Sequence, residues 1–209
     1  MCPSEEEEER PARQLRDKRA VRPPIRTGWH RLTMVERSGV RYSYCPQCAQ
    51  PLQRVLLEGR ERLTCRACGF VHYENPSPAV GVVVVNDSGV LLVKRKYAPR
   101  QGLWSLPAGF MEIDETPAET AVREAREETG LEVRVGPLLG VYAGDDDPRV
   151  RVVLIVYRAE IVGGSLVAGD DAEEARFFPL RGGLPEMAFA SHCRVLHEVT
   201  KQLRGGASR

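Results

Sequence analysis

The chain has 209 residues, 42% of them hydrophobic and 28% charged, which is the composition of a soluble globular protein with room for one ordinary domain and a smaller unit. No run approaches the ~20 apolar residues needed to cross a bilayer, and the acidic N-terminus lacks the apolar stretch of a secretory signal. We therefore expect a cytoplasmic protein that does not bind membranes. The formal net charge of +1 gives the molecule no field that would attract nucleic acid, so no nucleic-acid partner is expected.

Charge and proline content divide the chain into four parts. Residues 1–40 show no helical or strand periodicity and are predicted to be a disordered tail, in which Met34 is an alternative start. Residues 41–75 are predicted to form a compact unit framed by cysteines, with a short hairpin over residues 51–64 that turns at Glu58-Gly59. Residues 76–204 are predicted to form the main domain, and residues 205–209 a short tail. No functional prediction rests on the N-terminal tail.

Four of the six cysteines form two CxxC pairs, Cys45–Cys48 and Cys65–Cys68, separated by 16 residues. This spacing is typical of two facing knuckles whose four thiolates bind one tetrahedral zinc ion and leave no open coordination position. About 35 residues cannot bury enough surface to fold unaided, so the sequence predicts a structural zinc ribbon over residues 41–75. Disulfide or redox chemistry is the alternative, which the lack of an export signal disfavours.

The main domain alternates strand-like and helical segments. A β-branched run over residues 79–86 is followed by a turn and a second run over residues 90–96, which indicates a hairpin with a strand buried on both faces. The clearest helix covers residues 117–129, where Thr116 and Glu119 form a capping box. Strands with two helices packed on them make a layered α/β domain. Its other predicted elements are a loop over 97–114, strands over 131–135, 138–142, 150–160 and 176–180, and a helix over 191–203.

Three carboxylates of the predicted helix, Glu124, Glu127 and Glu128, share one face because residues three and four apart are neighbours on a helix. Like charges at this spacing repel, and the C-terminal half of a helix disfavours anions. Clustered carboxylate oxygens suit Mg²⁺ or Mn²⁺, so we predict a divalent-metal site with Arg123 beside it to orient a carboxylate. The alternative is an acidic helix face exposed to solvent, the usual explanation of a glutamate-rich stretch.

The segment from Gly109 to Leu131 carries a specific resemblance. Gly109 is followed after five residues by Glu115, and after seven more by Arg123-Glu124-Ala125-Arg126-Glu127-Glu128-Thr129-Gly130-Leu131, which resembles the Nudix box at every specified position. The resemblance implies an α/β/α sandwich with a mixed β-sheet. It also implies Mg- or Mn-dependent hydrolysis of the diphosphate linkage of a nucleoside diphosphate derivative to a nucleoside monophosphate and a phosphorylated product. By the same resemblance the site would consist of metal ligands Glu124, Glu127, Glu128 and the backbone carbonyl of Ala108, with Glu115 and Arg123 in supporting roles.

Residues outside the box are further candidates. Some members of the family take the proton from water with such a residue; Glu173 and Glu174 are candidates here, and a solvated loop is the alternative. Lys94 and Arg95 are candidates for binding substrate phosphates, or alternating charges on an edge strand. Trp104 is a candidate for stacking on a base, with packing beneath the box loop as the alternative.

A zinc ribbon followed by a Nudix domain resembles a subgroup that includes NADH pyrophosphatases and smaller FAD or ADP-ribose pyrophosphatases. The Ser-Gln-Pro-Trp-Pro-Phe-Pro motif usual in the NADH enzymes is absent from residues 135–153, so FAD or ADP-ribose is the nearer expectation. The alternatives are hydrolysis of nucleoside triphosphates or dinucleoside polyphosphates, and a nucleotide-sensing or nucleic-acid-binding module without turnover. The resemblance also allows a homodimer.

Overall fold

The computed structural model describes residues 42–144, 150–169, 171–180 and 183–205, with side chains described as far as residue 203. The expectations for residues 1–40, Met34 among them, lie outside this part of the chain. The same holds for the C-terminal tail after Gly205, which ends the last helix. Among the described residues, no helix is both long and apolar enough to span a membrane.

A three-stranded antiparallel sheet forms the cysteine-framed unit, in the order β1 (Gln53–Leu57), β2 (Arg60–Thr64) and β3 (Val71–His72). Glu58 and Gly59 join the first two strands with φ angles of 51° and 76°. Two successive positive φ angles match the right-handed twist of a two-residue hairpin. The hairpin predicted around Glu58-Gly59 is therefore confirmed.

A mixed sheet forms the main domain. Its strands run in the order β10-β5-β4-β9-β8, with β4 and β9 parallel and the other neighbours antiparallel. Two short strands extend it, β6 on β5 and β7 on β4. The bounds are β4 Ser77–Asn86, β5 Gly89–Arg95, β6 Trp104–Ser105, β7 Ala108–Phe110, β8 Leu131–Gly144, β9 Val152–Gly164 and β10 Ala172–Phe178.

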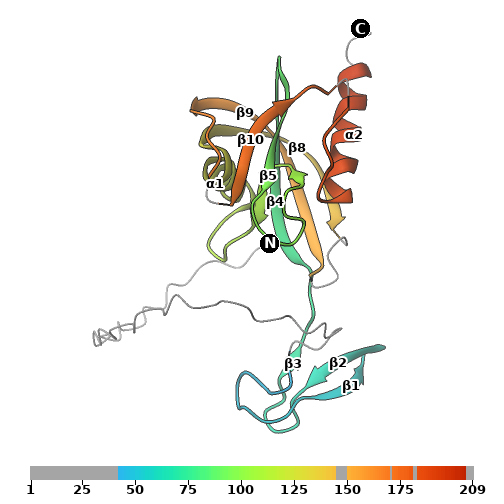
Figure 1. Cartoon of the computed structure of the whole chain (residues 1–209). Helices are drawn as coiled ribbons and strands as arrows, with labels where there is room; N and C mark the ends of the chain where they lie inside the picture. The colour runs from blue at the N-terminus through green and yellow to red at the C-terminus, as the bar shows by residue number, and fades with distance from the viewer. Residues whose placement is uncertain (1–41, 145–149, 170, 181–182, 206–209) are drawn as a thin grey trace, which may run out of the picture. The chain divides into compact units, whose positions relative to one another are not determined.

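Two helices, α1 (Pro117–Thr129) and α2 (Ala190–Gly205), lie on opposite faces of the mixed sheet (Figure 1). Successive side chains of a strand point to opposite faces, so the central strand β4 serves two cores. Its Val80 and Val84 pack in the core with α1, and Val83 packs in the core with α2. The β-branched run is buried on both faces as predicted, and the α/β/α sandwich is confirmed.

The sequence predicted a loop where the structure has two short strands. Residues 97–114 contain β6 and β7, which are two and three residues long and therefore too short to show periodicity. The runs predicted separately at 131–135 and 138–142 form one strand, β8, with a register shift between Val135 and Leu138. The intervening Gly-Pro interrupts the alternation without ending the strand.

Candidate functional site

The four cysteines predicted to bind zinc form one cluster. The Sγ atoms of Cys45, Cys48, Cys65 and Cys68 all lie within 4.8 Å of one another. Cys45 and Cys68 are 3.5 Å apart, and Cys48 and Cys65 are 3.4 Å apart. A tetrahedral zinc ion with bonds of about 2.3 Å would hold its sulfur ligands ~3.8 Å apart. The four thiols therefore fit a closed zinc site.

Backbone hydrogen bonds give both CxxC segments the same turn. The N–H groups of Ala49 and Gly69 donate to the carbonyls of Cys45 and Cys65, each at 2.9 Å. Ala49 and Gly69 also occupy equivalent left-handed positions, with φ of 59° and 77°. Each turn gathers its own two thiols, and the hairpin between the turns brings the two pairs together.

The helix α1 has the bounds predicted from its capping signals. Thr116 Oγ1 accepts a hydrogen bond from Glu119 N, and the Glu119 carboxylate accepts one from Thr116 N. Gly130 ends the helix in a left-handed conformation with φ of 68°. Ala121 and Ala125 are fully buried against the sheet. Their small side chains let the helix approach closely, which leaves its acidic residues at the edge of the core.

Arg123 contacts three of the predicted box carboxylates. Its Nη1 donates to Glu124 at 2.5 Å and to Glu127 at 3.0 Å, while its Nε and Nη2 donate to Glu115 at 2.5 and 2.8 Å. Nη2 also donates to the carbonyl of Phe110 at 2.9 Å. The hydrogen bonds from Arg123 lower the pKa of Glu115 to about 2. Arg123 and Glu115 therefore form a charged pair that ties α1 to the loop before it.

Two of the box carboxylates, Glu128 and Glu124, contact strand β7. The N–H of Ala108 donates to Glu128 Oε2 at 3.0 Å, and burial raises the pKa of Glu128 to about 8. Glu124 packs directly on Gly109, where an added Cβ would lie 2.0 Å from Glu124 Oε1. Burial raises the pKa of Glu124 as well. Glycine at position 109 thus makes the space for a carboxylate that is largely removed from water.

These carboxylates fit a divalent cation by charge. Burial disfavours the ionised forms of Glu124 and Glu128, and a nearby positive charge would restore them. Among the described residues, the four cysteines are the only group of three or more His, Cys, Asp or Glu side chains placed closely enough to hold a metal ion. The box carboxylates are less tightly gathered, because Arg123 holds Glu124 and Glu127. A cation at the box would compete with Arg123 for these two oxygens.

Strand alternation separates the two basic candidates. On β5, alternation from Leu91 predicts that Arg95 points to the α1 side. Its Nε donates to the carbonyl of Pro99 at 2.9 Å, and its guanidinium lies 5.2 Å from the ring of Phe189. Its charge opposes the rise that burial causes in the pKa of Glu128. Lys94 shares the α2 side with Leu92 and pairs with Glu173 at 3.2 Å. The structure therefore brings Arg95 to the carboxylates, whereas its placement of Lys94 does not support a substrate contact.

Trp104 and Glu174 also belong to the α2 side. Trp104 is 7% exposed and packs edge-on against Phe178, with ring centroids 4.6 Å apart. Arg176 lies over the same indole at 5.1 Å, so packing fits Trp104 better than stacking on a base. Glu174 forms an ion pair with Arg176 at 3.4 Å, two residues along the strand. This placement does not support Glu174 as a base acting at the box.

Sequence reasoning missed the segment that lies against the end of α1. Val167 N donates to the carbonyl of Thr129 at 2.9 Å, and Gly169 N donates to that of Glu128 at 3.1 Å. Asp171 follows, close enough for its charge to add to the rise in the pKa of Glu128. The last carbonyls of a helix need partners from elsewhere, but no local pattern indicates which residues would supply them.

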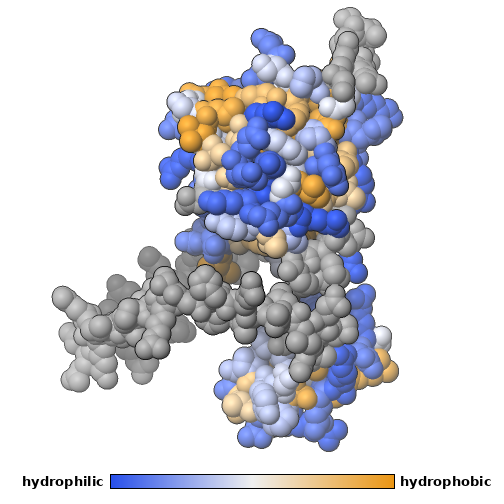
Figure 2. Space-filling model, viewed as in Figure 1, coloured by the Kyte–Doolittle hydropathy of each residue, from blue (hydrophilic) through white to orange (hydrophobic). Residues whose placement is uncertain are grey.

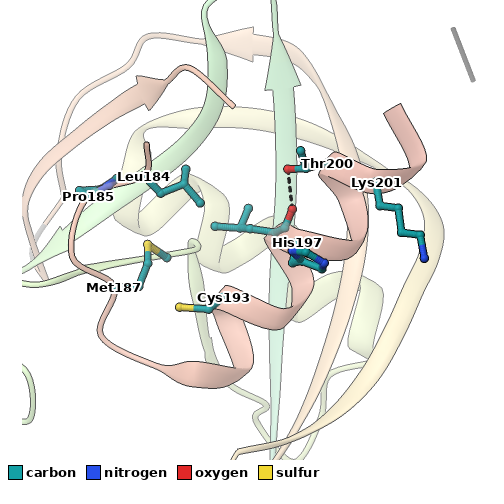
Figure 3. A pocket seen from close by; sticks show the side chains of 8 residues that line it. Leu184, Pro185, Met187, Cys193, His197, Thr200 and Lys201 are labelled. Atoms are coloured by element: carbon teal, nitrogen blue, oxygen red, sulfur yellow. Dashed lines mark hydrogen bonds between the residues drawn. The ribbon is translucent and has the colours of Figure 1, made fainter. Parts of the chain in front are cut away.

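An open cavity of about 620 Å³ lies between α2 and residues 184–187 (Figure 3). Leu184 and Met187 line one side, and Cys193 and His197 of α2 line the other. None of the residues predicted for the site lines this cavity. The candidate active site is therefore the cluster of charged side chains in the box and not this cavity.

Two family models match the chain, a NUDIX domain over residues 75–198 and a Nudix N-terminal zinc ribbon over residues 43–74. The chain is 45% identical to the ADP-ribose pyrophosphatase of Methanocaldococcus jannaschii over 134 residues, which are 64% of this chain and 78% of that protein. It is 32% identical to the NAD-capped RNA hydrolase NudC of Pseudomonas aeruginosa PAO1 over 168 residues. That match covers 79% of this chain and 58% of the hydrolase, so the chain spans little more than half of the latter's length.

A solved structure of the same family also matches the chain. The chain superposes on a NUDIX hydrolase from Nitrosomonas europaea with a TM-score of 0.71 at 32% identity, covering 79% of this chain and 94% of that one. The paired cysteines match the N-terminal ribbon, and the capped acidic helix with its glycine cradle lies within the matched catalytic domain. The chain is a member of the Nudix hydrolase family.

Proposed function

We propose that this enzyme hydrolyses the diphosphate linkage of an ADP-ribose-like nucleoside diphosphate derivative, with Mg²⁺ or Mn²⁺, to a nucleoside monophosphate and a phosphorylated product. The observation that carries the proposal is the half-buried pair Glu124 and Glu128 beside the Ala108–Gly109 backbone, with Arg123 bridging to Glu115 and Glu127. The relative that is 45% identical is named an ADP-ribose pyrophosphatase.

In this proposal the carboxylates of Glu124, Glu127 and Glu128 and the carbonyl of Ala108 hold the cation. When bound, a divalent cation neutralises the diphosphate and lowers the pKa of water. Arg123 keeps the carboxylates in place through its contacts with Glu115, which stays ionised because its pKa is lowered to about 2. Arg95, whose charge acts on Glu128, would bind a substrate phosphate through its guanidinium.

Asp171 replaces Glu174 as the proposed proton acceptor outside the box. Its neighbour Gly169 is hydrogen-bonded to the carbonyl of Glu128, and its charge acts on the same glutamate. Its side chain is exposed, so a carboxylate there is accessible to an attacking water.

ADP-ribose and FAD are proposed ahead of NADH or an NAD-capped RNA. The relatives named as NAD-capped RNA hydrolases are less similar, at 29% to 32% identity. The motif usual in NADH-cleaving members is also missing from this chain. Hydrolysis of nucleoside triphosphates and dinucleoside polyphosphates remain the alternatives within the family.

A substrate panel tests the proposal. The purified protein would be given ADP-ribose, FAD, NADH, a dinucleoside polyphosphate and a nucleoside triphosphate, each with Mg²⁺ or Mn²⁺, and nucleotide products would be resolved by chromatography. We expect AMP from ADP-ribose or FAD, lost in Glu127→Gln and kept in the matched surface variant Glu132→Gln. Tight binding of a nucleotide without turnover by the wild-type protein would instead indicate a sensor.

We also propose a homodimer. An apolar band crosses the upper part of the surface shown in Figure 2. Large apolar side chains exposed at or just after the end of β9 include Ile161 (40%), Val162 (56%) and Val167 (64%). Exposed apolar patches of this kind mark protein interfaces. Light scattering of the purified chain would give the mass of two copies, and a charged substitution at Val162 would return it to one.

A further inference from the structure

A buried histidine on α2 contacts the segment that leads into the box. His192 is 5% exposed, and its Nδ1 accepts a hydrogen bond from the backbone N–H of Leu106 at 3.1 Å. Leu106 is itself only 1% exposed, so this N–H is shielded from bulk water. A buried N–H without a partner is strongly disfavoured, and His192 therefore fixes the position of this peptide group.

Leu106 begins a three-residue segment whose backbone groups are all held in place. The carbonyl of Pro107 accepts from Val82 N of the central strand at 3.0 Å. The N–H of Ala108 donates to Glu128 Oε2 of α1 at 3.0 Å. The three bonds attach residues 106–108 to α2, to the sheet and to the box helix in turn.

The chain just before α2 is also hydrogen-bonded to β6, which precedes Leu106. Ala188 N donates to the carbonyl of Trp104 at 2.7 Å, and Trp104 N donates to the carbonyl of Glu186 at 3.0 Å. These backbone bonds place residues 186–188 beside β6 whatever side chain stands at position 192. His192 adds the next contact along the chain, one peptide nearer to Ala108, and it is the contact that depends on a side chain.

We propose that His192 is a positioning residue for the divalent-metal site. Through Leu106 it holds the peptide that carries Ala108, and Ala108 N–H in turn orients the carboxylate of Glu128 toward the cation. The hydrogen bond requires Nδ1 without a proton, so the imidazole acts in the tautomer protonated on Nε2. This inference rests on the proposed metal site at the box and adds a residue 64 positions away from Glu128 along the chain.

Two substitutions at this position separate positioning from packing. Asparagine keeps an acceptor, because its Oδ1 is bonded to Cγ as Nδ1 is in histidine. Leucine has comparable bulk and no acceptor. A matched stability control is Val195→Ala on the same helix, which opens a cavity at a residue with 0% exposure without removing a bond to Leu106. His197→Asn is the surface control, since His197 is exposed on α2.

The experiment measures Mn²⁺ binding by the full-length protein, from the electron paramagnetic resonance signal of the free ion, together with melting temperature. We expect His192→Leu to weaken Mn²⁺ binding about tenfold, the usual effect of removing a group that orients a metal ligand. His192→Asn should stay within about threefold of wild type on the same scale. Val195→Ala should melt earlier and bind Mn²⁺ normally, and His197→Asn should match wild type.

The outcomes distinguish this inference from the proposed function. Normal Mn²⁺ affinity in His192→Leu, or equal losses in the leucine and asparagine variants, would overturn the positioning role even if the wild type is an active pyrophosphatase. A wild type that binds Mn²⁺ without cleaving any substrate would overturn the proposed function, and the affinities of the variants would still decide the role of His192. Failure of the wild type to bind Mn²⁺ would overturn both.

Discussion

The two metal-ligand clusters of this protein are built in opposite ways. In the ribbon, short turns and a hairpin gather four thiols within 4.8 Å, and the ligands face one another. In the box, the glutamates are held by protein donors instead: Arg123 binds Glu124 and Glu127, and Ala108 N–H binds Glu128. The arrangement of the ribbon suits a permanently bound ion, whereas that of the box suits the exchangeable cation that we propose.

This difference follows from what each cluster stabilises. A unit of about 35 residues has too little core to fold without zinc, so its ligands contribute directly to folding. The main domain already has two hydrophobic cores and does not need an ion to fold. We propose that a cation and a substrate complete its carboxylates, because burial disfavours their ionised forms until a positive charge is near.

The largest effect is expected for Glu124→Gln. Loss of this carboxylate should reduce kcat by about 10³-fold, as when a group that stabilises transition-state charge is removed. The metal-free protein should be no less stable, because a carboxyl whose pKa is raised by burial is removed. Steady-state kinetics and thermal unfolding measure the two effects. A large drop in melting temperature would show that the box is structural, like the ribbon.

Asp171→Asn should have the next largest effect on turnover. Removing a proton acceptor lowers kcat by about 10²-fold or more, whereas Glu174→Gln, on the other side of the sheet, should leave it within about twofold on the same basis. Rates at saturating ADP-ribose and metal would show the contrast. Equal losses of activity in the two variants would contradict the choice of Asp171, rather than Glu174, as the proton acceptor.

Cys65→Ser should change the ribbon and spare the box. Cys65 is 2% exposed, and removing one of four thiolates should abolish zinc retention and unfold residues 43–74, as in other zinc-dependent units. Turnover by the box should change by less than about threefold, because its ligands fold with the main domain. Metal analysis and amide NMR spectra provide the measurements, with Cys193→Ser as the control. If turnover were lost together with zinc, the activity of the box would depend on the ribbon.

The smallest effect is expected for Glu115→Gln and should depend on pH. The pKa of Glu115 is lowered from 4.5 to about 2, first by the hydrogen bonds from Arg123, so the folded state favours its ionised form. Its contribution to stability is therefore complete above pH 4.5 and is lost as the pH falls through 2. The variant should melt earlier than wild type at pH 7, and the difference should shrink below pH 4.5. A difference that stays constant with pH would exclude the ion pair as its cause.

Local patterns were enough to predict the ribbon hairpin, both helices and a layered α/β domain, whereas the sandwich was implied by the resemblance to the Nudix family. The capping box of Thr116 and Glu119 placed the start of α1, and the β-branched run placed β4. Local patterns did not predict β6 and β7, which form because β5 and β4 supply their backbone hydrogen-bond partners. The candidate site shows the same division. Spacing identified the glutamates of the box, but not which basic residue of β5 lies on their side.

By itself, the sequence determined which residues can bind metal: the CxxC spacing and the helical period bring like ligands together over one or two turns of chain. The tertiary structure decided which distant residues join them, because contacts such as those of Asp171 and His192 depend on how the sheet stacks its two helices. It also decided the burial of Glu124 and Glu128. Burial is a property of the packed sandwich. It raises the pKa of these two glutamates, which a nearby cation would lower again.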